Sequence, residues 1–213
     1  MIIERFKEYR ENMGEFPDRV VVFRGGVSNG QTEKVMQAEV SELKKTFREM
    51  TNKPRLTYIV CSKGHNVRFY PTRAADADKT SNATAGTVVD QGVTGIYDFD
   101  FYLQAHSASQ GMARATHYTV MFDENNFTPD VVQQGINDIS HLWAPATKSV
   151  SLVPPAYWAD RACARARLYI HRVISPAEGS KEKKFSKEDV VNRAKGLWDD
   201  GVHEDLKGTM YFM

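Results

Sequence analysis

The spacing of apolar residues divides the first half of the chain into alternating helices and strands. Helical intervals predict two amphipathic helices, near residues 2–13 and 32–50, with apolar faces formed by Ile2, Ile3, Phe6, Tyr9 and Met13 and by Met36, Val40, Leu43, Phe47 and Met50. Thr32 is the expected N-cap of the second helix. Apolar runs predict strands at 19–24, 56–61 and 67–70. Residues 72–85 have few apolar positions, so we expect a loop there.

The second half of the chain continues the alternation. Residues 95–105 and 116–122 alternate between apolar and polar positions, which predicts two more strands. Thr128, Pro129 and Asp130 supply a cap, a proline at the first helical position and an acid in the first turn. The helix that they begin has an expected inner face of Val131, Val132, Ile136, Ile139 and Leu142. A further helix is predicted over 156–173, after two prolines.

The end of the chain has a different composition. Residues 175–185 are charged and contain glycine, so we expect a flexible linker there. Ser186 and Asp189 have the spacing of a capping box and predict a last helix. The tail 209–213 is apolar, and we expect it to dock onto another part of the protein.

The order of these elements favours an α/β fold, a mixed sheet flanked by helices. We expect residues 1–213 to form one domain, because this length can bury a sizeable core. The order alone does not distinguish an RNase H-like fold from other α/β folds.

Composition excludes some kinds of protein. The formal net charge is only +1, so a nucleic-acid site has to come from local clusters of lysine and arginine. The two cysteines, Cys61 and Cys163, lack metal-ligand spacing, and we expect two buried, unreactive thiols in a reducing compartment. We find neither a signal-peptide pattern nor a membrane-spanning run, which predicts a cytoplasmic location.

Three polar clusters are candidates for binding. One cluster follows the prolines and consists of Arg161, Arg165, Arg167 and Arg172. Guanidinium groups suit phosphate oxygens, although a solvated basic face is the alternative. The segment from His106 to His117 holds Gln110 and Arg114 between two strands; phosphate or sugar contact and ordinary loop hydrogen bonding are both open. Zinc is disfavoured because a third ligand is missing. The basic turn 63–68 is a candidate binding site only if it faces the other two clusters.

Acidic residues do not form a recognisable catalytic motif. Asp98 and Asp100 have the spacing to share one strand face, but the other acids are scattered. Two-metal hydrolysis needs several convergent carboxylates. The residues by themselves therefore indicate an α/β domain with a phosphate-facing surface.

Several segments, taken in order, resemble the Piwi domain of the Argonaute family. They are 22–31, 85–90, 99–103, Gln110-Gly111 with Arg114, His117-Tyr118, 149–157, Arg165-Ala166-Arg167 and 209–212. The resemblance implies an RNase H-like fold represented by its later part, without the first strands of the domain.

The resemblance also implies a role and a set of contacts. Arg165 matches an arginine that helps to hold the 5′ phosphate of a small guide RNA, beside residues of a Mid domain. Positions that match guide-backbone contacts are Lys63, Arg68, His106, Gln110, Arg114, Ser151 and Tyr157. The implied partners are the guide, its target RNA and Mid-domain or other Argonaute segments, in RNA-mediated gene silencing.

Departures from the family pattern concern metal binding and guide contacts. Gly25 stands where the family's slicer motif has an aspartate, and Asp160 matches the last member of the catalytic tetrad, which makes it the one expected metal ligand. Pro145 and Gly64 replace basic residues. We therefore expect guide binding without cleavage and no tightly bound cofactor. The alternative is a piece of an active Mg²⁺- or Mn²⁺-dependent RNA endonuclease, in which a nearby acid such as Asp90 or Asp98 compensates for Gly25.

Overall fold

A computed structural model describes residues 2–27, 29–50, 52–174, 186–197, 203–206 and 209–212. The chain divides into two compact units, Met1–Ala156 and Tyr157–Met213. The linker that we expect over 175–185 lies outside the described residues. In the part of the chain that is described, we find no helix with the length and apolarity to cross a membrane.

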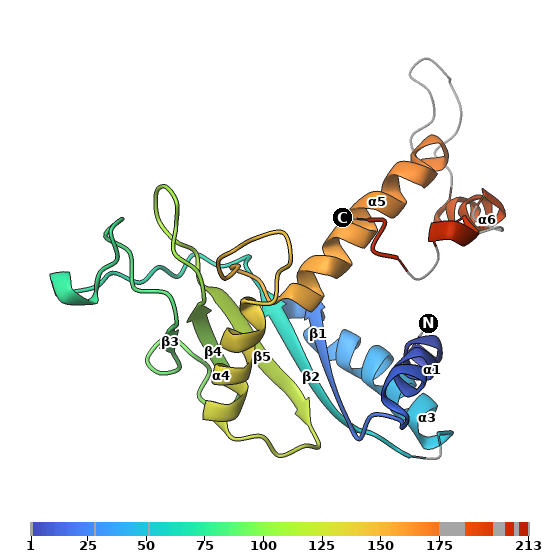
Figure 1. Ribbon diagram of the computed structural model, residues 1–213, viewed down its shortest axis with the longest axis horizontal. Helices are drawn as coiled ribbons and strands as arrows, with labels where there is room; N and C mark the ends of the chain where they lie inside the picture. The colour runs from blue at the N-terminus through green and yellow to red at the C-terminus, as the bar shows by residue number, and fades with distance from the viewer. Residues whose placement is uncertain are drawn as a thin grey trace. The chain divides into compact units, whose positions relative to one another are not determined.

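A five-stranded mixed sheet forms the centre of the first unit (Figure 1). Its strands are β1 (Arg19–Gly25), β2 (Arg55–Ser62), β3 (Thr87–Val89), β4 (Phe99–Gln104) and β5 (Thr116–Asp123), in the spatial order β1-β2-β5-β4-β3. β1 runs parallel to β2, and the other neighbouring pairs are antiparallel. The expected mixed sheet flanked by helices is confirmed.

Helices before and after β1 cover one face of this sheet. They are α1 (Ile2–Met13), the short helix Asn29–Gln31, α2 (Thr32–Val35), a π-helical turn (Met36–Val40) and α3 (Ser41–Arg48). Phe6, Val40 and Phe47 from these helices join Leu56 and Tyr58 of β2 in a buried cluster. The apolar face predicted for residues 32–50 is thus confirmed. In α1 only part of the predicted face is buried: Phe6 packs in the cluster, whereas Ile3, Tyr9 and Met13 are exposed. Thr32 is not the N-cap, however: Gln31 occupies that position, and no side chain caps the helix.

Residues 67–70 are not a strand, contrary to the sequence prediction. The guanidinium of Arg68 donates to the backbone carbonyl oxygens of His65 and Val67, at 3.2 and 2.7 Å, and Phe69 packs on Tyr102 with ring centroids 5.7 Å apart. These contacts hold the segment as an irregular loop, with no ladder partner among the described strands. The short strand β3 was not predicted, because three residues carry too little alternation.

α4 (Pro129–Ser140) begins and ends close to the predicted positions. Val132 and Ile136 are buried as expected, whereas the expected inward positions Val131 and Leu142 are 54% and 70% exposed. Leu142 lies beyond the last helical residue, where the helical period no longer governs which side of the chain is buried. The prediction of the inner face was therefore wrong at both of its ends.

The second unit contains most of α5 (Pro154–Ile174), α6 (Lys187–Leu197) and the short helix Glu204–Leu206. The capping box is confirmed: the Ser186 hydroxyl accepts from the Asp189 backbone N–H at 3.1 Å, and the Asp189 carboxylate accepts from the Ser186 N–H at 3.2 Å. The apolar tail also docks as expected, because Phe212 packs on Trp158 with ring centroids 6.0 Å apart.

The two thiols differ in their surroundings. Cys61 is buried in β2, and burial raises the pKa of its thiol far above the ordinary value. Cys163 is exposed on α5, so the expectation of two buried thiols was wrong for this residue. The sequence did not predict this exposure, because a single small residue such as Cys163 is tolerated on either side of a helix.

The cap of α4 provides a stability test. The Thr128 hydroxyl accepts a hydrogen bond from the Val131 backbone N–H at 3.4 Å. Thr128→Ala leaves this N–H without its partner, and we expect the free energy of unfolding in urea to fall by about 1 kcal/mol. Val131→Ala, an exposed change on the same helix, is the control, with an expected effect below about 0.5 kcal/mol. An equal effect of both variants would contradict a capping role.

Candidate nucleic-acid interface

The sheet topology brings the segments that follow β1, β2 and β4 to one end of the sheet. β2 and β4 both run antiparallel to β5, so the last residues of β2 and β4 and the first residues of β5 share one end of the sheet. The segments 63–71 and 105–115 leave from this end, and Gly25 ends β1 there because β1 is parallel to β2. Residues far apart in the sequence can therefore form one surface.

Lys63 is the centre of this surface. Its ammonium lies 2.5 Å from the Ser151 hydroxyl oxygen, and its backbone carbonyl accepts from the Arg114 guanidinium at 3.3 Å. Burial, followed by the charge of Arg114, lowers the pKa of Lys63. Burial, followed by the charge of Lys63, lowers the pKa of His106. Four of the predicted site residues are thus brought together, and the basic turn does face the loop 105–115.

His65 and Arg68 extend the surface along the same turn. The Nε2 atom of His65 lies 2.9 Å from the carbonyl oxygen of Ala115, an acceptor only, so this nitrogen carries the hydrogen. The other ring nitrogen, Nδ1, is buried and has no partner among the described atoms. Sequence reasoning placed His65 in the basic turn but did not select it as a site residue; its signal was an imidazole between two cationic positions.

The segment 149–151 is fixed against the sheet by hydrogen bonds. The Ser149 hydroxyl donates to the carbonyl of Ala105 at 2.6 Å, and the Thr116 hydroxyl donates to the carbonyl of Ser151. The Val150 N–H donates to the carbonyl of Ser140 at 3.0 Å. Ser151 is therefore held in place from both sides, which positions its hydroxyl for Lys63.

Carboxylates of the described residues do not neutralise the cationic groups of this surface. None of the ion pairs found in the described part of the chain includes Lys63, Arg68 or Arg114. Arg114 is exposed, while Lys63 and Arg68 are half-buried. Cations held without an acidic partner attract phosphate, and a guanidinium can bind two of its oxygens. We call Lys63, His65, Arg68, His106, Arg114 and Ser151 the basic surface.

The remaining predicted contacts lie elsewhere. Gln110 is exposed on the loop that carries Arg114. Tyr157 and Arg165 belong to the second unit, on α5, where the Arg165 guanidinium carbon lies 5.5 Å from the ring centroid of Tyr169. Arg161 lies 5.8 Å from the ring of Tyr157 in the same way. Their role in RNA binding stays a prediction.

Residues suited to a catalytic metal do not converge in the described chain. Gly25 offers no side-chain oxygen, and Asp160 is exposed on α5 of the second unit. Across the described residues, no three or more histidine, cysteine, aspartate or glutamate side chains are grouped so that they could hold a metal ion. Two-metal chemistry needs such a group. The residues present do not fit a metal pair, and the role of Asp160 as a ligand stays a prediction.

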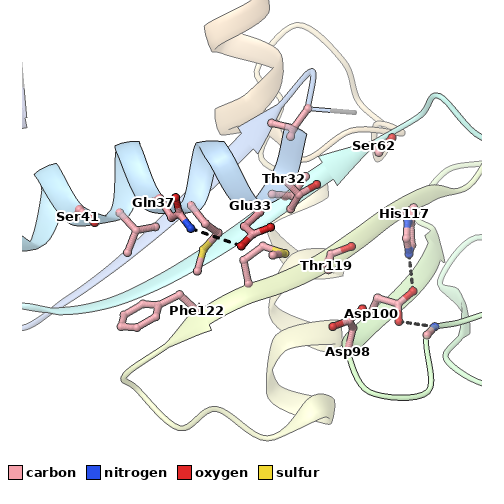
Figure 2. Close-up of a pocket in the computed structure, with 16 residues that line it drawn as sticks. Thr32, Glu33, Gln37, Ser41, Ser62, Asp98, Asp100, His117, Thr119 and Phe122 are labelled. Atoms are coloured by element: carbon pink, nitrogen blue, oxygen red, sulfur yellow. Dashed lines mark hydrogen bonds and ion pairs between the residues drawn. The ribbon is translucent and has the colours of Figure 1, made fainter. Parts of the chain in front are cut away.

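Asp100 lies on β4 as predicted, whereas Asp98 lies in the bend just before this strand and not on it. Both line a cavity of about 740 Å³ (Figure 2). Asp100 is buried; its carboxylate lies 2.6 Å from Nε2 of His117 and accepts from the Gly95 N–H at 2.8 Å. The His117 ring stacks on Tyr102, with centroids 4.4 Å apart. Sequence reasoning gave neither this histidine–aspartate pair nor the cavity.

The two histidines of the basic surface make stability depend on pH. Burial is the largest cause that lowers the pKa of both His65 and His106. An unfolded imidazole has a pKa of about 6.5, so below that pH the unfolded chain binds more protons than the folded chain. The two neutral histidines therefore contribute fully to the free energy of unfolding above about pH 6.5. This contribution falls as the pH decreases towards the lowered pKa values of the folded chain.

Urea unfolding at a series of pH values checks this dependence. We expect the double variant His65→Gln, His106→Gln to lose less stability than the parent chain between about pH 7 and pH 5.5, since glutamine does not titrate. His203→Gln is the control, because the His203 side chain is exposed and lies beside the exposed carboxylate of Asp205. Parallel curves for parent and double variant would refute the assignment.

Known proteins share both the sequence pattern and the fold. The Piwi domain profile matches residues 1–171, and the chain belongs to the Piwi-domain family of Argonaute proteins. Protein argonaute 5 of Arabidopsis thaliana is 37% identical over 188 residues, which cover 86% of this chain and 19% of that protein. Protein argonaute 10 of the same plant is 36% identical over 217 residues, 100% of this chain and 22% of that protein.

Solved structures give the same result. The C-terminal lobe of a budding yeast Argonaute superposes with a TM-score of 0.82 at 29% identity, covering 100% of this chain and 43% of that one. Kluyveromyces polysporus Argonaute with a guide RNA gives a TM-score of 0.83 at 29% identity, covering 100% of this chain and 26% of that one. The RNase H-like fold is thus confirmed. The chain spans about a fifth of the length of the two plant relatives.

Proposed function

We propose that this chain holds the phosphate backbone of a small guide RNA in RNA-mediated gene silencing and does not itself cut the target. The observation that carries the proposal is the basic surface, where Lys63, His106, Arg114 and Ser151 meet from three segments. Contacts of this kind bind phosphates in any sequence. They suit a protein whose sequence specificity comes from base pairing by its guide.

The charge pattern supports an anionic partner. The chain as a whole carries a net charge of only +1, yet three of its cations gather at one end of the sheet without acidic partners among the described residues. Local clustering of this kind is the electrostatic signature of a nucleic-acid site. A structural neighbour is an Argonaute with a guide RNA. By that similarity we propose guide RNA as the ligand and its target RNA as the second partner.

The second unit supplies the proposed 5′-phosphate contact. Arg165 is exposed on α5, and its guanidinium is free of acidic partners among the described ion pairs. We propose that it binds the 5′ phosphate of the guide together with Mid-domain or other Argonaute segments, and that Tyr157 and Gln110 contact the backbone. The proposed place of action is the cytoplasm.

Absence of cleavage rests on Gly25. A carboxylate is needed there in the family's motif, and glycine has none. We propose that neither Mg²⁺ nor Mn²⁺ is bound tightly by this chain. A Cβ added at Gly25 meets no atom within 4 Å, and Gly25 lacks the positive φ of Gly26, so Gly25→Asp is expected to fold as stably as the parent chain. Both chains can therefore be compared in cleavage assays.

Binding of a short single-stranded RNA, with a 5′ phosphate or a 5′ hydroxyl, at several salt concentrations tests the proposal. We expect affinity to fall linearly with the logarithm of salt concentration, with a slope of about −0.7 for each phosphate contact. Arg165→Ala is expected to weaken binding of the phosphorylated RNA more than that of the hydroxyl RNA. Lys45→Ala, an exposed change on α3, is the control.

Two results would overturn the proposal. Salt-independent or absent RNA binding by well-folded protein would remove the binding role. Guide-directed cleavage of a complementary RNA that is abolished by a chelator and by Asp160→Asn would show an active endonuclease instead. Cleavage by Gly25→Asp but not by the parent chain would agree with the proposal, because it would locate the missing function at that carboxylate.

A further inference from the structure

A second candidate site lies on the sheet face beside α2, and its lining residues differ from those of the basic surface. The cavity of about 740 Å³ is bounded by the helical segment 32–41 on one side and by β2, β4 and β5 on the other (Figure 2). Its size exceeds the needs of one bound ion, and the described residues include no group of three or more metal ligands. An organic ligand fits it better than a metal ion.

The walls of the cavity are aliphatic. Met36 and Val40 lie on the helical side, and Val60 and Met121 lie on the strands. Thioether side chains adapt their shape to an inserted group. Such walls suit the methylene stem of a long side chain, which gains by removal from water.

Three carboxylates line the cavity, and two of them, those of Glu33 and Asp98, have no ion-pair partner among the described residues. Figure 2 shows Glu33 on the helical side and Asp98 with Asp100 on the strand side. A Cβ at Gly95 would lie 3.2 Å from Asp100 Oδ1 and 3.3 Å from Asp98 Oδ2, so the two aspartates meet at this glycine. Only Asp100 has an ionic partner within the described chain, His117. Among the described lining residues there is neither lysine nor arginine.

Large apolar side chains are exposed next to the cavity. Ile96 and Tyr97 are 91% and 96% exposed, and they lie between the lining residues Gly95 and Asp98. Val93, on the same loop, is 49% exposed. A free amine entering the cavity would leave these side chains in water. Adjacent exposed apolar groups beside a recess are typical of a surface that binds another protein.

We propose that this cavity binds a segment of a partner protein in which an arginine or lysine is flanked by apolar residues. The stem of the basic side chain lies against Met36 and Met121, and its cation meets Glu33 and Asp98. The flanking apolar residues cover Ile96 and Tyr97. The acidic rim repels phosphate, so RNA is not the occupant. None of the residues that line the cavity belongs to the basic surface, although the ring of the lining residue His117 lies 6.3 Å from that of His65.

A fluorescein-labelled nonapeptide with arginine at its centre, leucine on both sides and otherwise glycine and serine is the probe. We expect its binding to the full chain, measured by anisotropy, to weaken at least about tenfold when its arginine is replaced by glutamine. The double variant Glu33→Gln, Asp98→Asn is expected to show the same loss. Tyr97→Ala is expected to lower the affinity for the peptide several-fold. Glu42→Gln, an exposed acid on α3, is the matched control.

The alternatives give different results. Equal binding of the arginine and glutamine peptides, or no binding at about 1 mM peptide by folded protein, would overturn the proposal. Competition by single-stranded RNA would show that the cavity belongs to the nucleic-acid site. Agmatine that binds as tightly as the peptide would show a small-amine site instead. Loss of RNA binding in Lys63→Ala with unchanged peptide binding would support two separate sites.

Discussion

The double variant Lys63→Ala, Arg114→Ala is expected to bind single-stranded RNA about a hundredfold more weakly than the parent chain at moderate salt. Each substitution removes one charge-assisted contact to phosphate, and each such contact contributes about 1.5 kcal/mol or more, roughly a factor of ten. The Arg114 guanidinium donates to the backbone carbonyl of Lys63, so both residues lie at the same end of the sheet. Fluorescence anisotropy with labelled RNA measures the change.

Salt dependence distinguishes loss of phosphate contacts from misfolding. The slope of log affinity against log salt is expected to decrease by about 0.7 for each contact removed. Lys45→Ala, which removes one positive charge on α3, is expected to leave both affinity and slope unchanged. If the double variant kept the affinity and slope of the parent chain, the basic surface would not be the RNA site.

Phe101→Ala is expected to lower the free energy of unfolding of the first unit by about 3–5 kcal/mol. Phe101 is fully buried in β4, and its ring stacks on Tyr118 of β5 with centroids 5.5 Å apart. Truncation removes this contact and leaves a cavity that neighbours fill only partly. A loss of this size is a large fraction of the stability of an ordinary domain. Urea unfolding, followed by circular dichroism, measures it.

Tyr97→Ala is the control for this prediction. The Tyr97 side chain is 96% exposed, four residues before Phe101, and its removal is expected to change stability by less than about 0.5 kcal/mol. A similar effect of the two substitutions would contradict the packing shown for β4. The unfolding measurement on Tyr97→Ala also shows whether a loss of peptide binding in this variant comes from unfolding.

Residues of the basic surface illustrate what a resemblance supplies and what it leaves out. Lys63, Arg114, His106 and Ser151 were selected because they match family positions, and the structure brings them together. His65 lies among them but was not selected, because a single imidazole in a basic turn resembles any solvated histidine. The cavity beside α2 had no motif at all, since its acids come from a helix and a loop far apart in sequence.

The amino-acid sequence by itself determined the features that depend on a few neighbouring residues. The capping box at Ser186 and the cap at Thr128 are local, because their hydrogen bonds act within one turn. Side-chain periodicity also identified the centres of the buried helix faces, such as Phe47 and Ile136. The lack of a carboxylate at Gly25 is also a property of the residue alone. These features were predicted correctly or could be read directly from the sequence.

Only the tertiary structure decided which distant residues meet. Antiparallel pairing of β2 and β4 with β5 places Lys63, His106 and Thr116 at one end of the sheet, and the hydrogen bonds of 149–151 add Ser151. Residues 67–70 stay out of the sheet because the Arg68 guanidinium binds the nearby carbonyls of His65 and Val67, and because Phe69 packs on the distant Tyr102. Strand order and register arise from burial and pairing between segments distant in sequence, which no local pattern of apolar and polar positions contains.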